Sequence, residues 1–135
     1  MARKTAIATL KKRAEFLAVA VSGKKWVASG MLVQIKKNLP SEQGTKESTD
    51  IKAAPLPRLR YGLTASKRVG NAVERNRARR RLRALAREVL IANSSPAYDY
   101  VLIARPATVT RAYGDLRRDL VTALKRLNVW QDKES

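Results

Sequence analysis

The sequence has no cysteine and no histidine among its 135 residues, and only 11 residues are acidic. Without cysteine the chain can form neither a disulfide framework nor a thiolate metal site. Without histidine it lacks the commonest side chain for general acid–base catalysis near neutral pH. Of the scattered acidic residues, only Asp115 and Asp119 have one-turn helical spacing, where salt bridges to Arg118 or Arg111 are the expected role. We therefore assign no catalytic residue and no metal ligand to the chain.

Long hydrophobic runs are also missing. No uninterrupted apolar segment approaches the roughly 20 residues that cross a bilayer. The first residues, MARKTAIATLKKRAEF, are basic but lack the long apolar core of a signal peptide. Trp26 and Trp130 lie far apart in the sequence and form no aromatic membrane-binding face. We therefore expect a cytoplasmic protein with no membrane partner.

Basic side chains, in contrast, are abundant. Lys and Arg together number 29, which gives a formal net charge of +18. Such an excess opposes compaction unless a polyanion neutralises it, so nucleic acid is the first partner to consider. A merely well-solvated basic surface is the alternative, but the clustering of the charge disfavours it. With 44% hydrophobic residues, the chain can still bury the core of one domain.

Hydrophobic periodicity predicts three helices and three strands, in the order helix, strand, strand, helix, strand, helix. The predicted helices cover about residues 11–21, 71–91 and 112–128, and the predicted strands about residues 26–36, 58–66 and 98–104. Residues 38–57 are polar and contain three prolines, which predicts a long, mobile connection. The pattern supports a single domain over residues 1–135, with a small α+β fold or mixed sandwich built on one sheet.

The predicted first and last helices each have an apolar stripe that we expect to be buried. In the first helix the stripe is Leu10, Ala14, Leu17 and Val21. Phe16 lies more than about 100° away from that stripe on a helical wheel, so it is expected outside the packed face. In the last helix the stripe consists of four leucines at helical spacing: Leu116, Leu120, Leu124 and Leu127.

The middle helix has the most distinctive sequence, GNAVERNRARRRLRALAREVL. Asn71 is its expected N-cap, with Glu74 placed to complete a capping box. Four arginines lie within about 60° of Asn76 on a helical wheel; they are Arg79, Arg80, Arg83 and Arg87. The other side of the helix is apolar and is expected to be buried: Ala78, Leu82, Leu85, Ala86 and Val89.

An arginine ridge of this kind suits RNA. Arginine pairs bidentately with phosphate, stacks on bases and keeps its charge. Neighbouring like charges repel one another on a free helix, and a bound polyanion removes that cost. A solvated surface helix is the alternative, but it would intersperse acids, and only Glu74 and Glu88 do so here. DNA is less favoured, because no zipper or helix-turn-helix accompanies this helix.

These residues resemble the signature of the bacterial ribonuclease P protein family. That signature runs R-x-G-L-(S/T)-x-S-K, then G-N-A-V, then R-N-R followed by R/K-R. Here the matching segments are residues 60–67 (RYGLTASK), 70–73 (GNAV) and 75–77 (RNR), followed by Arg79, Arg80 and Arg83. Residues 99–105 are similar to the family's third strand and residues 11–16 to its first helix. The resemblance therefore covers about residues 10–127.

The resemblance implies a four-stranded sheet packed by helices, with a left-handed βαβ crossover at the arginine helix, against the usual right-handed rule. Residues 26–38 and the connection after them would then contain two strands. It also implies a non-catalytic protein subunit of the endonuclease ribonuclease P. In that enzyme the RNA subunit binds most of the Mg²⁺ and removes the 5′ leader of precursor tRNA. The implied partners are ribonuclease P RNA and precursor tRNA, with no obligate protein partner.

The resemblance further implies two RNA contacts. The first contact is with the catalytic RNA and is made by residues of the arginine helix and the turn before it: Lys67, Arg68, Arg75, Asn76, Arg77, Arg79, Arg80 and Arg83. The second is a cleft between the first helix and the sheet, which receives the single-stranded leader. Phe16 has the family's aromatic position in this cleft, and its further lining residues are Trp26, Arg60 and Tyr61.

Two alternatives stay open at the level of sequence. Phe16 can be a stacking platform, which would tolerate any base, or an ordinary core phenylalanine. Many relatives carry a second aromatic four residues later, where this chain has Ala20, so weaker stacking or stacking on Trp26 or Tyr61 is expected. The chain as a whole could also be a ribosomal protein or RNA chaperone. A DNA-binding regulator is disfavoured because no dimerisation element is present.

Overall fold

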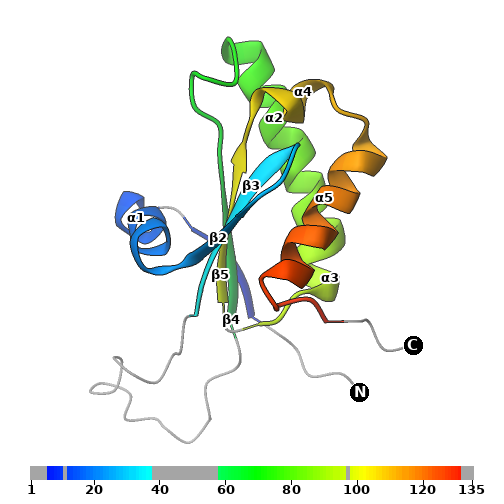
Figure 1. The fold of residues 1–135 in the computed structure, drawn as a ribbon. Coiled ribbons are helices and arrows are strands. Elements are labelled where there is room, and N and C mark those ends of the chain that lie inside the picture. Colours follow the sequence, from blue (N-terminus) through cyan, green and yellow to red (C-terminus); the bar gives the residue numbers. More distant parts are fainter. Residues whose placement is uncertain (1–5, 11, 38–57, 97, 132–135) are drawn as a thin grey trace, which may run out of the picture.

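The computed structural model of this chain describes residues 6–10, 12–37, 58–96 and 98–131. The predicted mobile connection over residues 38–57 lies outside these ranges. Figure 1 shows one central sheet with helices on both sides of it. Among the described residues, no helix combines the length and the apolar character needed to cross a membrane.

The sheet has five strands in the order β1-β4-β5-β3-β2. The strands are β1 (Ala6–Thr9), β2 (Lys24–Val27), β3 (Met31–Lys37), β4 (Arg58–Thr64) and β5 (Tyr98–Ala104). The helices are α1 (Arg13–Ser22), α2 (Ala72–Leu85), α3 (Ile91–Asn93), α4 (Pro106–Thr110) and α5 (Tyr113–Arg126). A π-helical turn, Ala86–Leu90, joins α2 to α3 without a break.

The α+β class is confirmed, and the sheet exceeds the expected four strands by one. The predicted strand over residues 26–36 is a hairpin of β2 and β3, which pair antiparallel. Among the described residues, the second strand of this pair, β2, therefore precedes β3. The fifth strand, β1, pairs parallel with β4 at the edge of the sheet. Sequence reasoning missed β1, β2 and α4, each of which is only four or five residues long.

The β4–α2–β5 unit is a crossover between adjacent parallel strands. In Figure 1 the chain ascends β4, descends α2 to the right of the sheet and ascends again in β5, which lies nearer to the viewer. That path is left-handed, as the resemblance implies and against the general preference. It places α2 on the same face of the sheet as α5.

The main core lies between the sheet and the helices α2 and α5. Strand alternation directs Met31, Val33 and Ile35 of β3 into it. The predicted leucine stripe of α5 is confirmed, because all four leucines are buried. The predicted stripe of α2 is also confirmed, because its five residues have no exposed surface. Burial of these side chains supplies most of the hydrophobic stabilisation of the fold.

Among the described elements, α1 covers the other face of the sheet, and the predicted stripe of this helix is wrong except for Leu10, which is buried just before the helix. Leu17 is 49% exposed and Val21 is 82% exposed. The buried contact is made by Val19, which forms a small cluster with Leu10 and Val101, against which Phe16 packs. The helix is therefore rotated so that Phe16, predicted to lie off the packed face, points toward the sheet.

Candidate nucleic-acid interface

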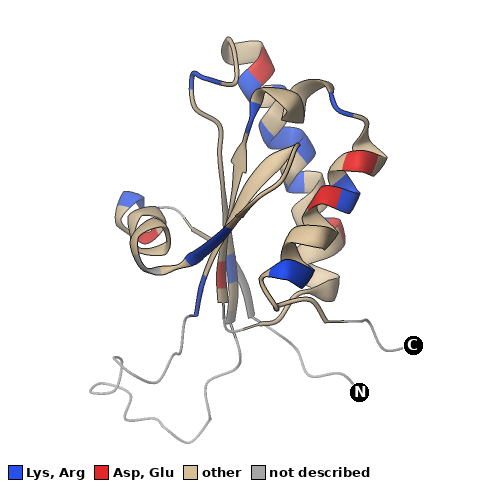
Figure 2. Cartoon of the chain, in the orientation of Figure 1, with Lys and Arg blue, Asp and Glu red and all other residues tan. Residues whose placement is uncertain are grey.

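The arginine face of α2 is formed as the sequence predicts. Asn71 caps the helix: its side chain accepts from the Glu74 N–H at 2.9 Å, and the Glu74 carboxylate accepts from the Asn71 N–H at 2.9 Å. Figure 2 shows basic residues repeating along α2. Most of the predicted contact residues on this helix are exposed, and Arg75 and Arg79 are partly buried. The helix thus presents a row of cations on a scaffold fixed by its buried side.

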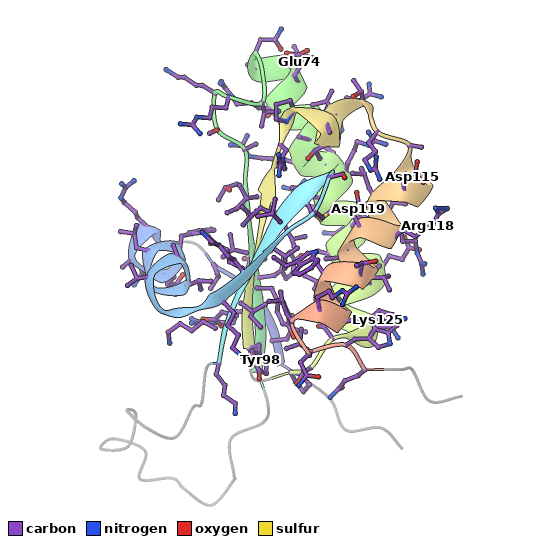
Figure 3. All side chains as sticks on the ribbon, in the orientation of Figure 1. Glu74, Tyr98, Asp115, Arg118, Asp119 and Lys125 are labelled. Atoms are coloured by element: carbon purple, nitrogen blue, oxygen red, sulfur yellow. The ribbon has the colours of Figure 1, made fainter. Side chains whose placement is uncertain are left out.

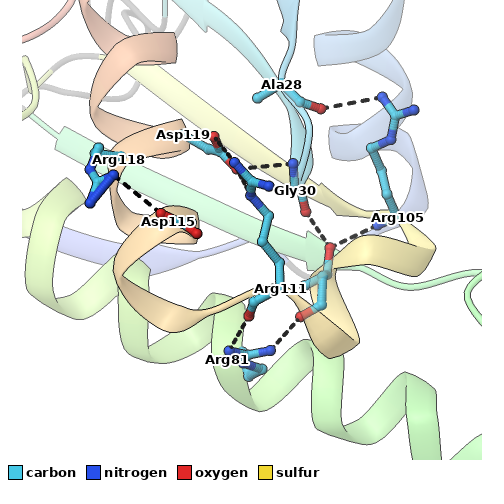
Figure 4. Close-up of polar contacts among 9 residues, drawn as sticks. Ala28, Gly30, Arg81, Arg105, Arg111, Asp115, Arg118 and Asp119 are labelled. Atoms are coloured by element: carbon cyan, nitrogen blue, oxygen red, sulfur yellow. Dashed lines mark hydrogen bonds and ion pairs between the residues drawn. The ribbon is translucent and has the colours of Figure 1, made fainter.

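Arg81 belongs to the same run of arginines but points inward. Its Nη1 donates to the Thr108 and Val109 carbonyls at 2.9 and 2.8 Å, and its Nη2 donates to the Arg111 carbonyl at 2.7 Å. Figure 4 shows this guanidinium directed at the backbone around the end of α4. Burial, together with the nearby charge of Arg77, lowers the pKa of Arg81. Arg81 therefore anchors α2, and sequence reasoning gave it no role.

A groove at the edge of β4 brings the two predicted contacts together. Phe16 contributes to one side of it, and Arg79 and Arg83 contribute from α2. The volume of the groove is about 290 Å³. Its other lining residues come from the end of β1, the residue after it and β4: Thr9, Leu10, Tyr61, Gly62 and Leu63. Because β1 pairs with β4 only as far as Tyr61, the edge beyond it is open to this groove.

Gly62 forms the floor under Phe16. A β carbon at position 62 would overlap Cε1 of the Phe16 ring, so the ring rests directly on the backbone of β4. Phe16 is partly buried in this place, with one side against the sheet and the groove beside it. Tyr61 lines the same groove as predicted, but it is 7% exposed and belongs to the main core. Little of the Tyr61 ring is accessible for stacking.

A second groove lies on the α1 side of the sheet, toward the carboxyl ends of β4 and β5. Leu32 and Ile103 form its apolar floor, and Arg68 and Arg105 stand at its rim. Arg105 also donates to the Ala28 carbonyl at 3.3 Å, as Figure 4 shows. Lys67 and Arg68 are both exposed in the turn before α2. Arg68 thus borders the sheet surface used by Phe16, and its predicted contact with the catalytic RNA stays a prediction.

Arg60 lies in an ion-pair network between α1 and the sheet. Its Nε and Nη2 donate to both carboxylate oxygens of Asp99 at 2.8 and 2.6 Å, and its Nη1 donates to Glu15 at 3.1 Å. The hydrogen bond to Asp99, offset in part by burial, raises the pKa of Arg60. The predicted cleft residue is therefore held in place by two acids. A lone acid in an otherwise apolar strand, Asp99, was the sequence signal for this partner.

Trp26 does not share a cleft with Phe16, so that prediction is wrong. Trp26 pairs with Val33 across the β2–β3 ladder, and directly paired residues point to the same face. That face carries α5, where the Arg126 guanidinium lies over the Trp26 ring at 5.6 Å. The sequence pattern did not show β2 as a separate strand. The face assigned to Trp26 was therefore based on a strand with the wrong boundary.

The acidic side chains of the described residues are engaged with other groups. Asp115 pairs with Arg118 at 3.2 Å and Asp119 with Arg111 at 2.8 Å, as expected from the sequence. Glu88 pairs with Arg117, and this hydrogen bond lowers the pKa of Glu88. Within the part of the chain that the structure describes, no three acids gather as metal ligands would. The arrangement offers binding surfaces for a polyanion and no evident acid–base pair.

Comparison with known proteins gives one consistent result. The family model described as Ribonuclease P matches residues 5–128. The ribonuclease P protein component of Paramagnetospirillum magneticum is 45% identical over 122 residues, covering 90% of this chain and 84% of that protein. The corresponding protein of Ruegeria pomeroyi is 42% identical over 123 residues, covering 90% and 87%.

Solved structures agree with the sequence comparison. The RNase P protein of Staphylococcus aureus superposes with a TM-score of 0.66 at 26% identity, covering 91% of this chain and 97% of that one. The RNase P protein of Thermotoga maritima has a TM-score of 0.65 at 22% identity, covering 92% and 97%. At 22% identity, the similarity to the Thermotoga maritima protein shows a shared fold and nothing more.

Proposed function

We infer the function of this chain from its family. The chain belongs to the ribonuclease P protein family. The function of that family is the processing of tRNA 5′ ends together with an RNA subunit. The chain is thus a protein component of ribonuclease P and a partner of ribonuclease P RNA. We propose that it acts in the cytoplasm.

We propose that the arginine face of α2 docks on the catalytic RNA. The supporting observation is the division of labour along one helix: Arg81 and the apolar stripe hold α2 to the protein, while Arg80 and Arg83 are left exposed. Phosphates meeting this row would relieve the repulsion between neighbouring guanidinium groups. The proposed contact residues are those predicted from the sequence, without change.

We propose that the groove at the edge of β4 and the adjoining sheet surface receive the leader of precursor tRNA. Phe16, fixed on Gly62, would stack a base, and Arg79 and Arg83 stand close enough to line the same groove. Stacking on an aromatic is tolerant of base identity, which suits a processor of many tRNAs. Arg60 would then act mainly by holding α1 against the sheet, since two carboxylates already engage it.

Hydrolysis is assigned to the RNA subunit, with Mg²⁺ bound mainly there. This assignment is supported by the sequence, which has no histidine, and by the engagement of five of the six described carboxylates with arginines. The protein would bind, orient and neutralise charge. Because its cations supplement Mg²⁺ in screening RNA–RNA repulsion, its effect should be largest at low Mg²⁺.

Reconstitution tests the proposal. The protein, a bacterial ribonuclease P RNA and precursor tRNA are mixed at low Mg²⁺, and a single cut at the mature 5′ end is expected only when both subunits are present. Cleavage by rigorously RNA-free protein would contradict the assignment of catalysis. Binding of many RNAs without stimulation would instead indicate a general RNA chaperone.

The docking face is tested by replacing Arg79, Arg80 and Arg83 with Ala. Affinity for the catalytic RNA should fall, and the slope of log affinity against log salt should decrease by roughly 0.7–0.9 for each phosphate that the protein no longer neutralises. A matched variant, with Arg117, Arg118 and Lys125 of α5 changed to Ala, removes the same charge elsewhere. Equal slopes for the two variants would mean that the arginine face acts only through net charge.

A further inference from the structure

The helix α1 crosses the strands of the sheet. Phe16, in its first turns, rests on Gly62 of β4; Val19 packs with Val101 of β5; and Gly23, just past its end, lies so close to β3 that a β carbon there would overlap the Ile35 carbonyl. The helix therefore runs from the β4 edge toward β2 (Figure 1). It leaves uncovered the strip of this face that lies toward the carboxyl ends of β4 and β5, where the second groove is found.

This open strip continues to the far edge of the sheet. The floor of the second groove includes Leu32, which pairs with Ile103 on one side and with Val27 of β2 on the other. Val27 is 53% exposed on the same face. From β4 to β2 the strip crosses three strand spacings, which is about 14 Å. A single strand that enters beside Phe16 therefore has a continuous surface leading to β2.

At that edge the side chains become cationic. Lys25 is on the same face as Val27, since it pairs with Gln34, which in turn pairs with Val101. Lys24 lies beside it on the opposite face, and both side chains are exposed. Among the described residues, no ion pair is formed by either lysine, whereas Glu15 and Asp99 of the neighbouring elements are engaged by Arg60.

We propose that Lys25, with Lys24 beside it, binds phosphates in the upstream part of a 5′ leader, beyond the nucleotides held next to Phe16. The proposal rests on the proposed function of the β4 groove. The order of the cations along this path supports the proposal. Arg79 and Arg83 border the first groove, and Arg68 and Arg105 border the second. The two lysines stand at the β2 edge of the sheet, which we call the exit. A lysine makes point-charge contacts with phosphate and reads no base, so this exit binds any leader sequence.

The competing explanation is that these lysines only protect an edge strand. Lysine on an exposed edge discourages pairing with another chain, and β2 is the edge of this sheet. The two roles differ in one measurable respect. Edge protection is indifferent to the length of the leader, whereas a phosphate contact at the exit exists only when the leader is long enough to reach β2.

The experiment uses the reconstituted enzyme and precursors whose leaders are lengthened one nucleotide at a time. For the wild-type protein, affinity should rise in two stages, first as the β4 groove fills and again as the strand reaches β2. In the Lys24→Gln/Lys25→Gln variant the second stage should disappear, with a loss of about three- to tenfold for long leaders and none for short ones. The salt slope for long leaders should fall by about 0.7, the value for single strands, for each phosphate that a lysine no longer neutralises.

The control is Lys125→Gln, which removes one charge from another part of the surface. Figure 3 shows Lys125 on the outer side of α5, away from α1, and this variant should retain both stages. Equal losses for short and long leaders, or an unchanged second stage in the double variant, would overturn the proposal. If leaders of every length fail to raise wild-type affinity, the proposed leader groove itself is wrong, which is a different and separately visible result.

Discussion

The helices α1 and α2 pack on opposite faces of the same sheet, and they are held there in different ways. In α2, three side chains of the helix itself are fully buried, and Arg81 adds three hydrogen bonds to backbone carbonyls. Among the α1 side chains whose burial the structure describes, only Val19 is fully buried, while Leu17 and Val21 face solvent. Further attachment of α1 comes from the Phe16 ring on Gly62 and from the ion pair of Glu15 with Arg60.

The difference separates a fixed platform from a helix held at a few points. Because the position of α2 depends on a broad buried stripe, changes on its exposed face should leave it in place. The position of α1 depends on Phe16, Val19 and the link from Glu15 to Arg60, so single changes there should alter the cleft. Binding of the catalytic RNA and of the leader should accordingly respond differently to mutation.

The largest effect is expected from truncating the buried stripe of α2. Leu82→Ala should lower the free energy of unfolding by about 2–5 kcal/mol, because it leaves a cavity in the main core. The matched change on α1, Leu17→Ala, should alter it by no more than about 0.5 kcal/mol. Denaturant unfolding of both variants measures the contrast. A comparable loss from Leu17→Ala would show that α1 is buried against something after all.

Phe16→Ala should weaken binding of precursor tRNA by about 1–3 kcal/mol, the usual value of one stacked base. Mature tRNA, which has no leader, should bind almost unchanged. Stability should fall by less than the about 3–5 kcal/mol seen when a fully buried phenylalanine is truncated. Affinities for both RNAs and a melting curve on this one variant decide the matter. Equal loss for precursor and mature tRNA, with a large drop in melting temperature, would make Phe16 a core residue.

Asp99→Asn tests the ion-pair attachment of α1. It removes the charge that engages Arg60 at 2.6 Å, and we expect a loss of about 1–2 kcal/mol in unfolding free energy, since solvent screens a partly exposed pair. Precursor affinity should fall with it, while affinity for the catalytic RNA should not change. Filter binding with each RNA separates the two. A parallel loss for the catalytic RNA would mean that the attachment of α1 also supports α2.

The smallest effect is expected from Ala20→Phe. Ala20 is exposed one turn after Phe16, so an aromatic there should add a partial stacking surface and strengthen leader binding by up to about 1 kcal/mol. The measurement is precursor affinity relative to mature tRNA. Unchanged affinity would place the leader on another side of α1, with the family assignment unaffected.

The sequence predicted α2 well and α1 poorly for a physical reason. In α2 the arginines leave only one side apolar, so the buried face could be read from Leu82, Leu85 and Val89. In α1 small apolar residues occur all round, and the stripe through Leu17 and Val21 is as regular as the true one through Phe16 and Val19. The contact with Gly62 determines which stripe is buried, because this residue has no side chain and so leaves room for the Phe16 ring.

The candidate site was predictable in part for a similar reason. The exposed arginines of α2 follow from helical periodicity, which is local. The exclusion of Trp26 from the cleft and the recruitment of Arg105 depend on the β2–β3 register and on a groove built from three separate segments. Pairing across such distances is not encoded in the periodicity of any one segment.

The hydrogen bonds around α4 link α2 to the β2–β3 hairpin. Arg81 holds the Thr108 carbonyl, the Thr108 hydroxyl donates to the Gly30 carbonyl at the hairpin turn, and the Gly30 N–H donates to Asp119 at 3.0 Å. The arginine face and the hairpin are thus connected by a continuous chain of hydrogen bonds. In the proposed complex, this chain of hydrogen bonds would help to keep an RNA docked on α2 at a fixed separation from a leader strand that crosses β2.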